Sequence, residues 1–265
     1  MLKDIILHLE HDSSRDIVRD FAASIAETFA AHLTGVAFAF AANIPADALG
    51  GLFDESEAEA RGAVDRFELA MKRDDLSAES RLVLGTPRTF SEMARCFDLS
   101  VIMQSDDRNG VDNSLLIEAA LFDSGRPLII VPSTQKDRLK LERVVCCWDG
   151  SRTAARAIHD ALPLLKKANA VEIFIVENEK TANEHVPRGI EISRHLARHD
   201  IKVEVKTTLA ADSDVANAIL SHAADGSTSL LVMGGYGHSR LREFVFGGAT
   251  RGILSAMTIP VFMSH

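Results

Sequence analysis

The chain has 265 residues, of which 46% are hydrophobic and 25% charged, as expected of a folded globular protein and not of a disordered chain. Residues 1–140 carry 15 Lys and Arg against 24 Asp and Glu, a net charge of −9, whereas residues 141–265 carry 14 of each sign. This acidic balance, with no basic stripe, argues against nucleic acid and against an anionic membrane as partners.

The cysteines and the N-terminus indicate the compartment. Cys96, Cys146 and Cys147 are odd in number and form no C-x-x-C motif, which favours thiols in a reducing environment over a disulfide framework. Charged residues interrupt the first apolar run, and no stretch approaches the roughly 18 apolar residues of a membrane helix. We therefore expect a cytoplasmic protein without a membrane segment.

Apolar runs of strand length alternate with segments of helical periodicity along the whole chain. In the first half, strands are predicted at 3–9, 33–40, 77–84, 99–105 and 127–133, and helices at 13–31, 54–73, 87–97 and 114–123. In the second half, strands are predicted at 142–148, 170–176, 202–208, 229–235 and 260–264, and helices at 151–168, 188–199, 213–224 and 248–257. Continuous Val, Ile and Leu runs flanked by helices indicate parallel strands covered on both faces. With right-handed crossovers, the predicted class is α/β, as two tandem doubly wound, five-stranded, mostly parallel Rossmann-like sheets.

The two halves repeat the same unit. Met103 and Met233 end matching apolar runs, and the closing runs PLIIVP and PVFMS also match. The polar segment 133–142 interrupts the pattern and is the predicted linker, which gives domains at 1–134 and 141–265. Two copies of a whole domain indicate a duplication, because solenoid repeats are far shorter.

The strongest functional signal is the segment MGGYGHSRLREFVFGGATRGIL at 233–254, between a predicted strand and a predicted helix. Glycines just beyond a strand's carboxyl end leave backbone N–H groups free to hold phosphate, and the amino end of the next helix favours an anion. The candidate nucleotide-binding residues in this segment are Met233, Gly234, Gly235, Gly237, His238, Arg240, Gly247, Gly248, Ala249 and Thr250. The pattern predicts a nucleotide site, with a purely structural loop as the alternative.

Asp149 follows the first predicted strand of the second half, in the sequence CWDGS. A carboxylate there can accept hydrogen bonds from a ribose or from an adenine amino group. The alternative is a helix N-cap at Asp149 or Ser151, and the two roles can coexist.

The second half resembles the universal stress protein superfamily over its whole length. The resemblance is carried by Asp149, by Val176 at the end of FIV, and by G-x2-G-x9-G at Gly234, Gly237 and Gly247. It implies an adenine nucleotide alpha-hydrolase-like fold, an adenine pocket lined by Asp149 and Val176, and glycines that hold ribose and phosphates. The implied ligand is ATP, or alternatively ADP or AMP, with Mg²⁺ as the ion that would accompany the phosphates.

One position departs from the family motif, which continues with Ser or Thr where this chain has Gly248. Loss of a hydroxyl–phosphate hydrogen bond would lower affinity about 10- to 100-fold, although Thr250 could supply the hydroxyl instead.

The first half resembles the same family by its pattern of elements, most clearly in VLGTPRTFSEMARCFDLSVIM at 83–103. The three motif glycines are replaced, in order, by Gln104, Asp107 and Ile117, and either Glu10 or Asp12 would match the aspartate after the first strand. We expect a degenerate domain that binds no nucleotide.

These observations predict a nucleotide-binding regulatory protein of the stress response and not an enzyme, with at most slow ATP hydrolysis, because no Walker lysine is present. The alternatives are a ligand-free interaction or scaffold protein of the same fold and an adenylating enzyme, whose S-G-G-x-D-S loop is replaced here by CWDGSR. The resemblance also implies that the exposed fifth strands pair within the chain, and a homodimer is a further expectation.

Three lesser features have structural interpretations that we favour. His195 and His199 have zinc-ligand spacing, but HLARH lacks the glutamate of H-E-x-x-H, so a solvated helix face is expected. Cys146 and Cys147 are expected to pack in the core and not to act in redox chemistry. The segment 41–62 is expected to include a long loop before an acidic helix.

Overall fold

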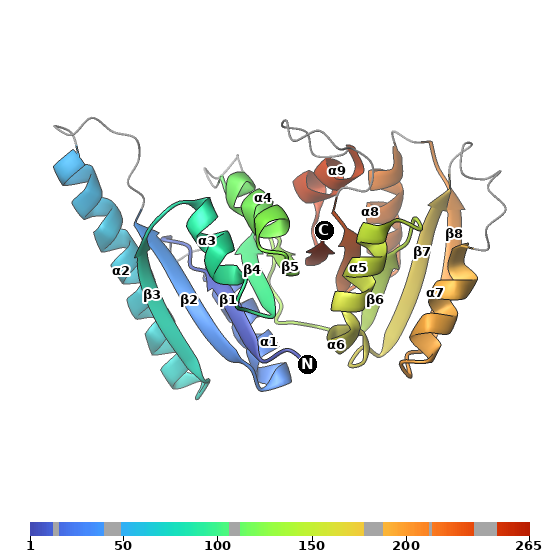
Figure 1. Cartoon of the computed structure of the whole chain (residues 1–265), viewed down its shortest axis with the longest axis horizontal. Helices are drawn as coiled ribbons and strands as arrows, with labels where there is room; N and C mark the ends of the chain where they lie inside the picture. Colours follow the sequence, from blue (N-terminus) through green and yellow to red (C-terminus); the bar gives the residue numbers. More distant parts are fainter. Residues whose placement is uncertain (13–15, 40–48, 106–111, 178–187, 212–213, 236–247) are drawn as a thin grey trace. The chain divides into compact units, whose positions relative to one another are not determined.

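The computed structural model describes residues 1–265 apart from 13–15, 40–48, 106–111, 178–187, 212–213 and 236–247 (Figure 1). The chain divides into two compact units, Met1–Leu139 and Lys140–His265, called here the N-terminal and the C-terminal unit. Within the described ranges, no helix is long and apolar enough to cross a membrane.

The N-terminal unit is a five-stranded sheet with helices between successive strands. Its elements are β1 (Asp4–His8), α1 (Ile17–Phe29), β2 (His32–Ala39), α2 (Leu49–Arg73), β3 (Ala78–Leu84), α3 (Pro87–Ala94), β4 (Leu99–Met103), α4 (Ser114–Asp123) and β5 (Leu128–Val131). The strand order is β3-β2-β1-β4-β5, and the neighbouring strands run parallel.

The C-terminal unit repeats this arrangement. Its elements are β6 (Arg143–Cys147), α5 (Arg152–Asp160), α6 (Leu162–Leu165), β7 (Ala170–Glu177), α7 (Arg188–Ala197), β8 (Val203–Leu209), α8 (Val215–Asp225), β9 (Leu230–Gly234), α9 (Gly248–Ala256) and β10 (Val261–Ser264). The strand order is β8-β7-β6-β9-β10, again with parallel neighbours. The predicted α/β class, with parallel strands in an equivalent order in each unit, is confirmed.

Close packing places helices on both faces of the N-terminal sheet. On one face, the Phe67 ring of α2 lies 3.0 Å from where a Cβ on Gly35 of β2 would stand, so only glycine allows this approach. On the other face, the rings of Phe38 on β2 and Phe90 on α3 lie 6.2 Å apart. Both phenylalanines are fully buried, so the core of this unit extends over the two faces of the sheet.

The C-terminal sheet is covered in the same way. Gly189 at the start of α7 packs against Ile175 of β7 and Val205 of β8. On the opposite face of β7, Phe174 stacks on the ring of His222 from α8, with ring centroids 3.9 Å apart. Burial on both faces explains why β7 is a nearly continuous apolar run, whereas most residues of β8 are exposed.

Two element predictions were wrong in detail. The helix expected at 151–168 is two helices. Pro163 has no N–H to continue the hydrogen bonding of α5, so α5 ends before it and a second helix, α6, begins with the proline in its first turn. The loop expected within 41–62 gives way to helix at Leu49, so α2 is longer than expected despite its glycines. Favourable residues over its 25 positions outweigh the local cost of glycine.

Residues 133–142 form neither helix nor strand and are anchored to α1 on the N-terminal side. The Leu139 N–H donates to Ser24 Oγ at 2.8 Å, and Arg138 pairs with Glu27 at 2.5 Å.

Candidate functional site

The sequence Asp149–Ser151 forms a turn at the carboxyl end of β6. Gly150 has φ +78°, a left-handed conformation with open space around it, which glycine adopts without strain. Asp149 Oδ1 accepts a hydrogen bond from the Ser151 N–H at 2.9 Å, and Ser151 Oγ accepts one from the Ala154 N–H at 3.1 Å. Ser151 is therefore the N-cap of α5, while Asp149 shapes the turn and keeps an exposed carboxylate.

Gly234 ends β9 against the first turn of α5. A Cβ at this position would lie 2.5 Å from the backbone N of Ala154 and the backbone C of Thr153, so a larger residue would force the strand and the helix apart. Gly235 continues the ladder to the neighbouring strand, since its N–H donates to Ser264 O at 2.8 Å. The packing of β9 against α5 therefore requires glycine at position 234, independently of any ligand.

The start of α9 combines an open surface with a buried hydroxyl. Gly248 is exposed, and a Cβ added to it would meet nothing within 4 Å. Ala249 is half-buried and Thr250 is only 5% exposed. The backbone N–H groups of a first helical turn lack partners within the helix, so this exposed turn offers donors to an anion.

Two further predicted residues lie at strand ends. Val176 is the penultimate residue of β7 and is half-buried, whereas Met233 on β9 is 5% exposed and pairs in register with Met263 of β10. Four predicted residues lie outside the described residues: Gly237, His238, Arg240 and Gly247.

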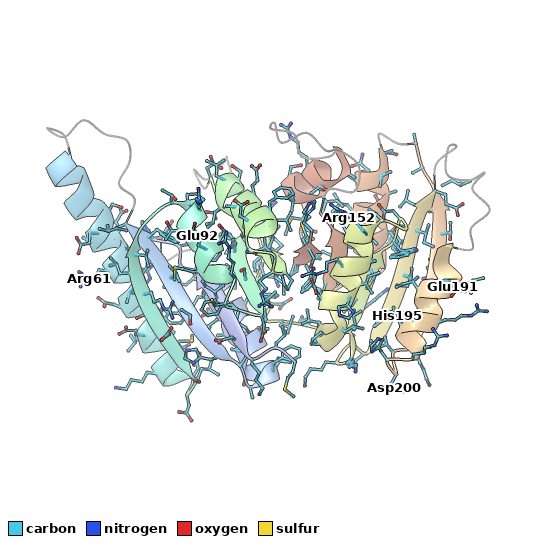
Figure 2. The ribbon with its side chains drawn as sticks, in the orientation of Figure 1. Arg61, Glu92, Arg152, Glu191, His195 and Asp200 are labelled. Atoms are coloured by element: carbon cyan, nitrogen blue, oxygen red, sulfur yellow. The ribbon has the colours of Figure 1, made fainter. Side chains whose placement is uncertain are left out.

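Arg152, an exposed residue at the first position of α5, was missed by the sequence reasoning (Figure 2). A cation at a helix amino end is unfavourable, because the helix dipole is positive there. The first turn of α5 contains no acidic residue to offset it. An unfavourably placed arginine three positions after Asp149 could have served as a signal.

The adjacent thiols fit the expected packing role. Burial raises the pKa of both cysteines, and for Cys147 burial, reinforced by the nearby Asp149 and Glu172 carboxylates, raises the pKa to about 12. Both thiols are therefore protonated near neutral pH, and a protonated thiol is a poor nucleophile.

A buried charge cluster in the C-terminal unit was also missed. Glu172 on β7 is 2% exposed and contacts three basic side chains from other elements: Arg143, Lys206 and His222. Its contact with Lys206 is 3.2 Å long. The isolated glutamate within AVEIFIV was the only sequence signal, since its partners lie far away along the chain.

The strand registers correct the match between the two halves. Gln104 N–H donates to Val131 O and Gly235 N–H donates to Ser264 O, each at 2.8 Å and each at the end of the fifth strand of its unit. Gln104 therefore stands at the position of Gly235, and the prediction that it replaces Gly234 was wrong by one residue.

A second correction concerns the start of the following helix. Ile117 was expected near the position of Gly247, but it is a buried residue inside α4. The residue that directly precedes α4 is Asn113, as Gly247 directly precedes α9. The connection is ten residues long in the N-terminal unit (104–113) and thirteen in the C-terminal unit (235–247), which a constant offset could not reveal. Asp107 lies outside the described residues.

The first strands also align by hydrogen bonds. The Leu9 N–H donates to β2 and the Trp148 N–H donates to the corresponding position of β7, at 2.8 and 2.9 Å. Glu10, and not Asp12, is therefore the counterpart of Asp149.

The family model described as the universal stress protein family matches residues 140–265. Residues 140–265 therefore belong to the universal stress protein family. It is 26% identical to universal stress protein YxiE of Bacillus subtilis over 143 residues, which is 46% of this chain and 97% of that protein. It is also 26% identical to universal stress protein Slr1230 of Synechocystis sp. over 140 residues, 51% of this chain but only 46% of that protein, so the match spans about half of that relative's length.

Comparison of folds extends over both units of the chain. The crystal structure of a universal stress protein from Archaeoglobus fulgidus DSM 4304 has a TM-score of 0.77 and 16% identity, and the match covers 98% of this chain and 96% of that one. This likeness concerns the fold alone.

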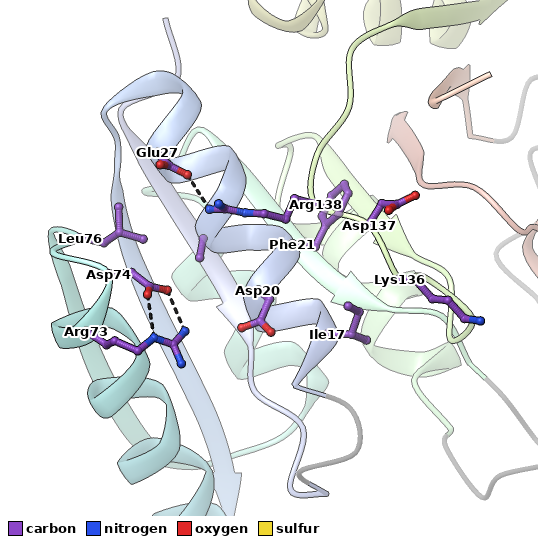
Figure 3. A pocket seen from close by; sticks show the side chains of 11 residues that line it. Ile17, Asp20, Phe21, Glu27, Arg73, Asp74, Leu76, Lys136, Asp137 and Arg138 are labelled. Carbon is purple, nitrogen blue, oxygen red and sulfur yellow. Dashed lines mark hydrogen bonds and ion pairs between the residues drawn. The ribbon is translucent and has the colours of Figure 1, made fainter. Parts of the chain in front are cut away.

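A separate hollow of about 430 Å³ lies in the N-terminal unit, between α1, the end of α2 and the segment 136–138 (Figure 3). Most of its charged lining is already paired, because Arg138 contacts Glu27 and Arg73 contacts Asp74. The hollow does not include the predicted site residues.

The two histidines spaced like zinc ligands lie side by side, with ring centroids 4.8 Å apart, at and just beyond the end of α7 (His195 is labelled in Figure 2). Among the described residues, no group of three or more His, Cys, Asp and Glu side chains could hold a metal ion.

Proposed function

We propose that the C-terminal unit binds one adenine nucleotide at its carboxyl edge, and that the nucleotide regulates the protein in a stress response. The observation that supports this is the set of exposed groups at the switch point of the sheet, where the chain leaves β6 in one direction and β9 in the other. Asp149 lies there, with the starts of α5 and α9 close by in the topology. Open α/β sheets bind ligands at this point.

Each described residue has a role in this proposal. The Asp149 carboxylate accepts hydrogen bonds from ribose or adenine, and Val176 offers an apolar contact to the base. The backbone N–H groups of Gly248 and Ala249 hold phosphate oxygens, with Mg²⁺ as the accompanying ion. Gly234 lets the end of β9 approach α5. The remaining proposed contacts come from Met233, Gly235, Gly237, His238, Arg240, Gly247 and Thr250.

Arg152 gives the site a positive charge. A phosphate near the start of α5 would neutralise both this guanidinium and the positive end of the helix dipole, so a destabilising arrangement in the free protein becomes favourable in the complex. We expect Arg152→Gln to weaken ATP more than AMP, because a triphosphate carries more charge.

Trp148, the single tryptophan of the chain, is adjacent to Asp149 and reports directly on this site. Titration of the protein with ATP, ADP and AMP should change Trp148 fluorescence, and mass spectrometry of ligand released by acid should find one adenine nucleotide per chain. Asp149→Ala and Gly237→Asp should abolish the change. Asp200→Asn, which alters an exposed carboxylate beyond the end of α7, is the matched control and should bind normally.

The family motif supplies a gain-of-affinity test. Gly248→Ser restores the motif hydroxyl at an exposed position with open space, so nucleotide affinity should rise about 10- to 100-fold.

The activity we propose is binding with at most slow hydrolysis. If no nucleotide changes the fluorescence or releases heat in calorimetry, the ligand-free scaffold becomes the better hypothesis. ATP–pyrophosphate exchange would instead favour an adenylating enzyme. Pairing of the fifth strands within the chain, and a homodimer, stay predictions that sedimentation and cross-linking can test.

A further inference from the structure

The carboxyl edge of the N-terminal unit is filled by side chains of the chain itself. Phe38 is the penultimate residue of β2, as Val176 is of β7. Whereas Val176 is half-buried, Phe38 is fully buried, and its ring lies 5.9 Å from that of His8 and 6.2 Å from that of Phe90. A large aromatic ring thus occupies the strand end where the other unit has a small aliphatic side chain.

Glu10 is the counterpart of Asp149 and differs from it in exposure. Asp149 is exposed, but Glu10 is 8% exposed. Glu10 Oε1 accepts a hydrogen bond from Asn113 Nδ2 at 2.8 Å, and it lies 3.3 Å from Nδ1 of the buried His8 ring. A hydrogen bond to a buried carboxylate is stronger than one between neutral groups, and either partner left alone would be costly.

Asn113 joins the start of α4 to two strand ends. Its side chain is 6% exposed and donates to Glu10 and also to Met103 O at 3.2 Å, while its own N–H donates to Ser105 Oγ at 2.9 Å. An asparagine at a helix start commonly caps the helix, but here it makes no side-chain cap bond. The amide is used to connect α4 with the ends of β1 and β4.

The segment that follows Glu10 is held from α2. Arg66 Nη2 donates to Glu10 O at 3.2 Å and to His11 O at 2.8 Å, and His11 Nε2 lies 2.9 Å from Phe38 O. The corresponding turn of the C-terminal unit has an exposed aspartate and a glycine with open space around it.

We propose that Glu10, Phe38 and Asn113 form an internal plug, an autoinhibitory contact that closes the N-terminal copy of the site. The plug takes the place of a ligand: its carboxylate–amide hydrogen bond and its aromatic ring tie β1, β2, β4 and α4 together without any bound molecule. The N-terminal unit therefore excludes nucleotides by occupation as well as by loss of the glycines. That this edge is a copy of a ligand site rests on the proposed function, whereas the contacts of the plug lie within the N-terminal unit alone.

Hydrogen exchange on the full chain tests the plug through a double-mutant cycle of Glu10→Gln and Asn113→Ala. Each single variant should speed exchange in residues 99–103 and 114–120 about 10- to 100-fold, the range expected for a buried hydrogen bond to a charged group. The double variant should be little faster than Asn113→Ala alone, because that substitution already removes the hydrogen bond that Glu10→Gln weakens. Asp123→Asn, which changes an exposed carboxylate at the other end of α4, should stay within about threefold of the parent protein.

Single effects that multiply in the double variant would overturn the plug, because independent contacts behave in that way. Slower exchange in the N-terminal unit on addition of AMP or ATP would overturn it as well. If nucleotides change exchange in neither unit, the proposed function fails, while the result of the double-mutant cycle still decides whether the plug exists.

Discussion

At the carboxyl edge of the sheet, the N-terminal unit buries the side chains that the C-terminal unit leaves exposed. Glu10 is buried and hydrogen-bonded to Asn113 in the first, whereas its counterpart Asp149 is exposed in the second. Strand order, parallel pairing and helix placement are the same in both. A few side chains at strand ends can therefore open or close a site without any change in the sheet that carries them.

The largest expected effect comes from Phe38. Phe38→Ala should destabilise the N-terminal unit by about 3–5 kcal/mol, because a fully buried ring is lost and a cavity remains. At the corresponding position, Val176→Ala should cost only about 1 kcal/mol, since Val176 is half-buried.

Urea unfolding followed by two signals separates these effects. Circular dichroism reports on both units, while fluorescence of Trp148 reports on the C-terminal unit. A large shift of the fluorescence midpoint in Phe38→Ala would contradict the assignment of this ring to an independent core.

Glu172 offers the next contrast, because its counterpart in β2 is Thr34. Glu172→Ala should destabilise the C-terminal unit by about 3 kcal/mol, since Arg143, Lys206 and His222 lose the carboxylate that they share. Thr34→Ala, which removes only a neutral donor to Glu79, should cost about 1 kcal/mol. Equal losses at the two positions would show that the charge cluster adds nothing.

Acid sharpens the same contrast. Burial by itself would raise the pKa of Glu172, but hydrogen bonds from His222 and Lys206 and the charge of Arg143 outweigh it, so the pKa lies below its ordinary value of 4.5. This carboxylate therefore stabilises the folded unit fully above about pH 4.5, and the contribution is lost as pH falls through the lowered pKa. Trp148 fluorescence during urea unfolding at several pH values should show this decline, and Glu172→Gln should remove it.

Gly234 tests the approach of β9 to α5. Gly234→Ala places a Cβ 2.5 Å from backbone atoms of Thr153 and Ala154, so the C-terminal unit should lose about 1–3 kcal/mol. Gly248→Ala is the control, because that position has open space and alanine favours helix. Stability of Gly234→Ala equal to that of the parent protein in the fluorescence assay would show that the strand can move aside.

The smallest effect is expected at the helix starts. Ser151→Ala removes the cap of α5 and should cost about 1 kcal/mol. Asn113 occupies the comparable place before α4 but bonds to Glu10, so its replacement should cost more. Calorimetric unfolding of both variants measures the difference, and the reverse ranking would argue against the plug.

Much of the fold followed from sequence because buried parallel strands leave continuous apolar runs, and Gly and Pro mark their limits. Pro163 indicates the break after α5, whereas the helical periodicity on both sides of it predicts one continuous helix. Glu10 and Asp12 were both candidates for the counterpart of Asp149 in the N-terminal unit, and only the hydrogen bonds between strands could decide between them.

The rest depended on contacts between residues remote in sequence. Asn113 and Glu10 are 103 positions apart, and His222 and Glu172 are 50 apart, so neither pair leaves a local pattern. Met103 was matched with Met233 because the two residues are identical. That single match could not reveal that the connection before α4 is shorter than the one before α9.

The anchored segment after β5 has a consequence for proteolysis. A chain between two units is ordinarily a preferred site of cleavage, because exposed backbone without hydrogen bonds fits easily into a protease. Here the Leu139 N–H donates to Ser24 and Arg138 is paired with Glu27, so this segment must first dissociate from α1 before a protease can bind it. Limited digestion should therefore separate the two halves slowly, and fragments of half the chain's length should be late products.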